Sequence, residues 1–85
     1  MPYITKADAE RFEESLESLP QAGTAGELNY LFTRIALKYV KAHGLRYAVL
    51  NDVMGALTGA QAEFYRRLVA KYEETKISDN GDLYP

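Results

Sequence analysis

Residues 46–76 have the sequence RYAVLNDVMGALTGAQAEFYRRLVAKYEETK, and this stretch decides the fold. Its apolar side chains recur at i, i+3, i+4 and i+7, which is typical of an amphipathic helix. They are Leu50, Val53, Met54, Leu57, Phe64, Tyr65, Leu68 and Tyr72. A continuous helix over this stretch would be about 45 Å long. A compact domain of this length is only about 24 Å across, so the helix needs long partners from its own chain or from another copy.

Two more helices are predicted upstream. Thr5 suits the N-cap of a short helix over residues 5–19, which Pro20 ends. Thr24 and Glu27 form a capping box that opens a helix over residues 24–43, and Gly44 ends it. The connection to the long helix is very short, so these two helices should run antiparallel.

The predicted fold class is therefore all-α, with a short N-terminal helix and a long antiparallel helical hairpin. We expect a single domain over residues 1–85, with the third helix over about 46–76 and a tail over 77–85. The second helix carries a second stripe of apolar and polar side chains, opposite its core stripe. A monomeric two-helix hairpin would leave this stripe without a packing partner, so we expect an oligomer. The members of this stripe are Tyr30, Thr33, Arg34 and Leu37.

Two features of the third helix leave alternatives open. Thr58 and Gln61 resemble a second capping box, so the helix could break near Thr58. We favour continuity, because the apolar stripe keeps its phase. Gly55 and Gly59, with Ala62, form a small-residue face that admits either the first helix or another subunit.

Composition limits the function. The 85-residue chain has a net charge of -2, which gives no general attraction to long nucleic acids. It contains no cysteine, so thiol chemistry and thiolate metal sites are excluded. No apolar run approaches the length of a membrane span, and the N-terminus lacks a signal segment. We expect a cytoplasmic protein with no cofactor and no membrane partner.

The strongest candidate for ligand binding is Tyr65 with Arg66 and Arg67. Adjacent guanidinium groups offer forked donors for phosphate, and the tyrosine ring can stack on a base. The alternative is that Glu63 simply pairs with Arg67 on an exposed face. Arg34 and Tyr30 could join the cluster across a subunit boundary and complete a pocket for a small anion.

Other polar clusters favour structural roles. Glu13, Glu14 and Glu17 match the EExxE motif of all-α MazG-type pyrophosphohydrolases, which hold magnesium with helical carboxylates. The second element of that family, ExxD, is missing, so a solvated acidic face is favoured. His43 has no second imidazole beside it, and residues 79–82 indicate a turn rather than a calcium loop.

Several blocks of the chain together resemble a family of small uncharacterised proteins from phages, prophages and some bacteria and archaea. The blocks are PYIT, GELNY, LND, VMGAL, EFYRR, YEETKI and NGDLY, in that order. Where that family often has proline before YE, this chain has Lys71, which favours a continuous helix. The resemblance implies that its motifs include Glu27, Asn29, Tyr30, Asn51, Asp52, Glu63, Tyr65, Arg66, Arg67, Tyr72, Glu73, Lys76, Asn80, Gly81 and Asp82.

A looser similarity, in size and architecture only, links the chain to phage proteins that sequester cyclic nucleotide signals. We therefore expect a non-enzymatic oligomer that sequesters a small nucleotide-like anion through Tyr65, Arg66, Arg67, Arg34, Tyr30 and Asn29. One alternative is an adaptor that binds only protein. A second is a MazG-like nucleoside triphosphate pyrophosphohydrolase that uses Glu13, Glu14 and Glu17 with Glu27 or Glu63.

Overall fold

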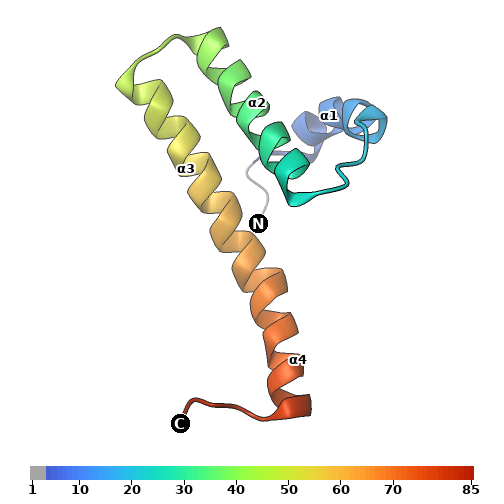
Figure 1. Cartoon of the computed structure of the whole chain (residues 1–85). Coiled ribbons are helices and arrows are strands. Elements are labelled where there is room, and N and C mark those ends of the chain that lie inside the picture. The colour runs from blue at the N-terminus through green and yellow to red at the C-terminus, as the bar shows by residue number, and fades with distance from the viewer. Residues whose placement is uncertain (1–3) are drawn as a thin grey trace. The chain divides into compact units, whose positions relative to one another are not determined.

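The computed structural model describes residues 4–85, and these are helical or irregular throughout, with no strand. In chain order the elements are α1 (Lys6–Ser18), α2 (Ala25–His43), α3 (Tyr47–Phe64), the π-helical segment η1 (Tyr65–Val69) and α4 (Ala70–Asn80) (Figure 1). The predicted all-α class is confirmed. The chain divides into two compact units, Met1–Phe32 and Thr33–Pro85.

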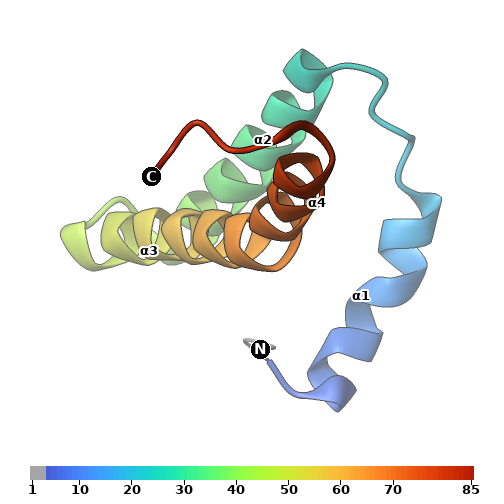
Figure 2. The ribbon, with the colours of Figure 1, turned by 90° about the horizontal axis from the view of Figure 1, so that it is seen from below.

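The first unit contains α1 and the beginning of α2, joined by an extended segment (Figure 2). Thr5 caps α1, because its hydroxyl accepts a hydrogen bond from the Asp8 amide at 3.1 Å. At α2, the Thr24 hydroxyl accepts from the Glu27 amide at 3.1 Å. The Glu27 carboxylate accepts in turn from the Gly23 amide at 2.6 Å. Side chains thus satisfy amides that the first turns leave without helical partners.

The second unit begins with the rest of α2 and turns into α3 at Gly44. This glycine has φ +94°, and its amide donates to the Val40 carbonyl at 2.8 Å. A glycine at such a position ends a helix at little cost, because it has no Cβ to clash. Beyond the turn, the Tyr39 hydroxyl of α2 donates to an Asp52 carboxylate oxygen of α3 at 2.9 Å.

The helix that starts at Tyr47 runs through Thr58 without a break and continues through η1 into α4 (Figure 1). It ends at Asn80, and the expected end near residue 76 is therefore wrong by about one turn. The physical reason is that the helix stops where Gly81 adopts φ +90°, so residues 77–80 form its last turn rather than a tail.

Burial is sparse in the described residues. Val49, 2% exposed, is the one buried residue among residues 4–85, and it lies outside the apolar stripe predicted for this helix. The stripe residues Met54, Phe64, Leu68 and Tyr72 are all more than half exposed. None of the described helices is long and apolar enough to cross a membrane.

Candidate functional site

The candidate arginine cluster lies on the π-helical segment η1. The Ala70 amide donates to the Tyr65 carbonyl, five residues back, which is the bond that defines a π turn. Such turns are rare and are frequently found at functional sites. Tyr65, Arg66 and Arg67 are the first three residues of this segment, so the structure brings half of the predicted ligand-binding residues together on one turn.

Glu63, one turn before the arginines, holds both of them. The Arg66 Nη2 donates to both carboxylate oxygens of Glu63, at 3.0 and 3.1 Å. Arg67 is more loosely engaged, with its Nη1 at 3.9 Å from Glu63 Oε2. These spacings, i+3 and i+4, are the ones at which helical side chains meet. The predicted Glu63–Arg67 pair is present, but Arg66 is the stronger partner.

The electrostatic consequence is a carboxylate that stays ionised. The hydrogen bond from Arg66, and next to it the positive charges of Arg66 and Arg67, hold the pKa of Glu63 below its usual value of 4.5. The arginine side chains themselves remain 69% and 60% exposed. An incoming anion can therefore reach both guanidinium groups, but it has to compete with Glu63 for Arg66.

The remaining predicted ligand residues lie on α2. Asn29 and Tyr30 belong to the first unit, and Arg34 belongs to the second. Each of them has interactions within the protein. Their union with Tyr65, Arg66 and Arg67 across a subunit boundary stays a prediction.

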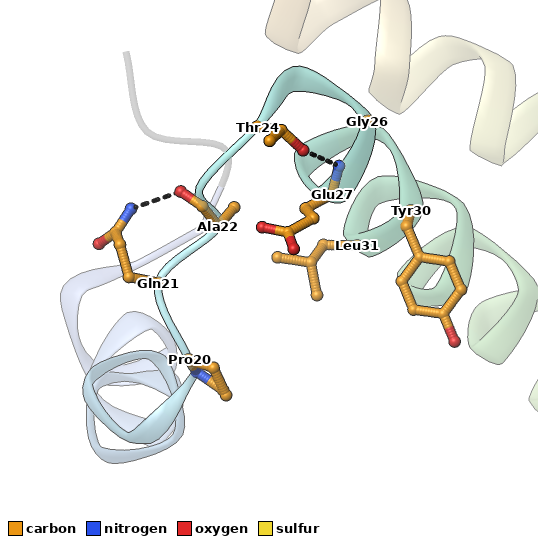
Figure 3. Close-up of a pocket in the computed structure, with 8 residues that line it drawn as sticks. All are labelled: Pro20, Gln21, Ala22, Thr24, Gly26, Glu27, Tyr30 and Leu31. Carbon is orange, nitrogen blue, oxygen red and sulfur yellow. Dashed lines mark hydrogen bonds between the residues drawn. The ribbon is translucent and has the colours of Figure 1, made fainter.

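Tyr30 lines an open pocket of about 520 Å³ at the start of α2 (Figure 3). The figure shows the Glu27 and Leu31 side chains directed toward the loop that carries Pro20 and Ala22. The polar groups here serve the helix cap, since Glu27 and Thr24 both make capping hydrogen bonds. What remains is a mostly apolar lining. Its residues are Pro20, Gln21, Ala22, Thr24, Gly26, Glu27, Tyr30 and Leu31.

A polar contact that the sequence analysis did not predict joins Tyr39 to Asp52. The Tyr39 ring also lies 4.3 Å from the His43 ring, centroid to centroid. The hydrogen bond to Asp52 raises the pKa of the Tyr39 hydroxyl above its usual value of 10.0. Both residues are close to the short turn at Gly44, so an antiparallel pairing of the two helices around that turn could have indicated the contact.

The acidic motif on α1 does not gather a metal-ligand set. Glu13, Glu14 and Glu17 all lie on α1. Among the residues that the structure describes, no three carboxylate or histidine side chains are grouped so that they could hold a metal ion.

Comparison with known proteins places the chain in a family. No curated protein and no solved structure matches the chain. A family profile, described as Domain of unknown function (DUF6899), matches residues 1–83. Since the match covers nearly the whole chain, this protein belongs to the DUF6899 family.

Proposed function

We propose that this protein is a non-enzymatic homo-oligomer of phage type that sequesters a small, nucleotide-like anion through the π turn at Tyr65, Arg66 and Arg67. The observation that carries the proposal is the coincidence of the arginine pair with the π-helical segment. A π turn within a long helix interrupts the regular hydrogen bonding, and such turns are frequently found at functional sites.

Assembly is supported by the exposed apolar side chains of the long helix. Met54, Phe64, Leu68 and Tyr72 fall on its predicted apolar stripe and are all more than half exposed. Burying such side chains is the main favourable term in protein association. Association with copies of the same chain would supply that burial.

Anion binding is supported by the chemistry of the turn. Two adjacent guanidinium groups present planar, forked donors, which suit the oxygens of a phosphate. Tyr65, 53% exposed, supplies an aromatic face beside them, and bases stack on such faces.

The test is a thermal-shift screen against linear and cyclic nucleotides, with an Arg66→Ala/Arg67→Ala variant. A ligand that binds the folded state raises the melting temperature by mass action. We expect one class of nucleotide to raise it by several degrees, and we expect the double variant to lose that shift. Lys41→Ala, which removes a cation from the end of α2, is the matched control and should keep the shift.

A panel in which no nucleotide stabilises the wild-type protein would contradict the proposed ligand class. A shift that survives in the double variant would contradict the proposed site. Unchanged nucleotide after prolonged incubation with magnesium is expected as well, because sequestration does not turn the ligand over. Release of pyrophosphate would favour the MazG-like alternative instead.

A second candidate function is an adaptor that binds only protein. The hydrogen bonds from Arg66 Nη2 to both Glu63 carboxylate oxygens favour it, because an arginine already paired within its helix can serve as an ordinary surface charge. In that case the exposed apolar side chains are the functional surface. The double arginine variant would then retain every interaction of the wild-type protein.

A further inference from the structure

The C-terminal end of α4 carries a motif that the proposed function does not use. Asn80 is the last residue of the helix, Gly81 follows it, and Asp79 and Asp82 flank the pair. Asparagine is a thermolabile residue, and it is most labile before glycine. The backbone nitrogen of the next residue can attack the side-chain carbonyl carbon, and a glycine has no Cβ to obstruct that approach. The motif therefore has a chemistry of its own.

The reaction at such a pair needs only water. The Gly81 amide loses its proton to hydroxide, and its nitrogen attacks Cγ of Asn80 to close a succinimide ring. The side-chain nitrogen takes a proton from water and leaves as ammonia. Water then opens the ring at one of its two carbonyl carbons, which leaves aspartate or isoaspartate at position 80. Overall, one water is consumed and one ammonia is released.

The backbone at Gly81 leaves room for that attack. Its φ is +90° and its ψ is 166°, so the chain leaves the helical path directly after Asn80. A Cβ built on Gly81 would meet nothing within 4 Å among the residues that the structure describes. Asn80 is itself exposed, so water and hydroxide reach both reacting groups. The site is open to solvent and uncrowded on the glycine side.

One hydrogen bond protects the amide that has to react. The Gly81 N–H donates to the Ile77 carbonyl at 2.8 Å and closes the last turn of α4. While this bond is intact, it stabilises the protonated amide. Attack on Asn80 therefore requires the last turn to open.

The last turn of α4 is weakly held. Residues 77–80 contain no lysine or arginine, and Asp79 adds a negative charge where the helix dipole is already negative. Lys76, the nearest cation in the sequence, has its ammonium group 5.4 Å from the centre of the Tyr72 ring, one turn back. All four residues of the last turn are exposed. A terminal turn with so little burial opens more readily than the rest of a helix.

We infer that Asn80 is a modification site, at which the chain deamidates itself through the Gly81 amide when the last turn of α4 opens. The product carries a new carboxylate between Asp79 and Asp82, at the negative end of the helix dipole. Both the like charges and the dipole oppose a closed turn there. The isoaspartate product also inserts a carbon into the main chain, which displaces the Gly81 amide from the Ile77 carbonyl.

Deamidation thus removes the last turn of α4 and cannot be reversed by the protein itself. The effect is independent of the proposed anion site, because it uses no residue of the π turn. It changes the charge and the length of the helix end with no enzyme and no cofactor.

Peptide mapping by mass spectrometry tests the site in the 85-residue chain. The other two asparagines, Asn29 and Asn51, precede tyrosine and aspartate inside α2 and α3 and serve as internal controls. The protein is incubated folded, and unfolded in urea at the same pH. We expect conversion at Asn80 alone in the folded protein, faster conversion there in urea, and a rate that rises with pH. Asn80→Gln should stay unmodified, because its longer side chain would have to close a less favourable ring.

Three results would overturn the inference. Asn80 that stays intact in the folded protein, yet converts in urea, would show that the last turn stays closed. Asn80 that stays intact in urea as well would show that the pair is not labile in this chain. Equal conversion at Asn29 or Asn51 would show that the following glycine does not direct the reaction.

Hydrogen exchange at the Gly81 amide tests the consequence for the helix. Asn80→Asp carries the charge of the product, and Asn80→Gln is the matched uncharged control. After correction for intrinsic exchange rates, we expect protection of the Gly81 amide to be about two- to fivefold lower in Asn80→Asp, the range expected for one charge at a helix end. Equal protection in both variants would show that the new carboxylate leaves the last turn closed, which would overturn the proposed loss of that turn.

Discussion

At the scale of single residues, Glu63 controls access to the arginines. Its carboxylate accepts two hydrogen bonds from Arg66 and competes with any anionic ligand. Glu63→Gln keeps the shape of the side chain and removes its charge. We expect pyrophosphate to bind this variant about two- to fivefold more tightly, the range expected for one exposed ion pair. Titration calorimetry on both proteins measures the ratio, and weaker binding to the variant would show that Glu63 supports the ligand rather than opposing it.

Tyr39 provides a second prediction at this scale, which concerns pH. The hydrogen bond to Asp52 stabilises the protonated hydroxyl, so the pKa of Tyr39 is higher in the folded protein than in the unfolded chain. Its contribution to the free energy of unfolding is complete below pH 10 and disappears as the pH rises through the folded-state pKa.

Tyr39→Phe should therefore unfold at a lower urea concentration than the wild-type protein at pH 7. The two midpoints should converge as the pH is raised above 10. Parallel midpoints across that range would mean that the hydrogen bond to Asp52 contributes nothing in solution.

At the scale of elements, a substitution at Gly55 tests whether another backbone packs closely against the small-residue face of α3. A Cβ added at Gly55 would meet nothing within 4 Å. Alanine favours a helix over glycine by about 0.5–1 kcal/mol, so Gly55→Ala should stabilise the protein by that amount. Urea unfolding measures it. Destabilisation would instead indicate that another backbone crosses α3 closely at this glycine.

The starts of the first two helices and the end of the second were predictable from sequence, whereas the end of the long helix and its π turn were not. Thr5, Thr24 and Gly44 act through local chemistry, with hydroxyls that accept from nearby amides and a glycine that tolerates positive φ. Tyr65–Val69 contains no proline or glycine that would signal irregular backbone, so its widened turn leaves no mark in the sequence pattern. The pairing of Arg66 with Glu63 was not predicted for a simpler reason. Arg66 at i+3 and Arg67 at i+4 compete for the Glu63 carboxylate, and the sequence alone does not show which of them binds it more closely.

At the scale of the whole molecule, periodicity identified the apolar faces but could not say what covers them. Leu50 and Leu57 fall on the predicted stripe and are still 39% and 45% exposed. An apolar stripe on a helix indicates that this face is buried in the functional protein. It does not indicate whether the same chain or another copy covers the face. This is why the class of the fold followed from the sequence, whereas the position of the core did not.

The mass of the protein in solution, measured by sedimentation over a wide concentration range with helicity followed in parallel, tests self-association most directly. We expect a multiple of the 9.6 kDa chain mass, and we expect helicity to fall when dilution separates the copies. A chain that stays at 9.6 kDa and keeps its helicity and cooperative unfolding at every concentration would contradict self-association, and with it the proposed homo-oligomer.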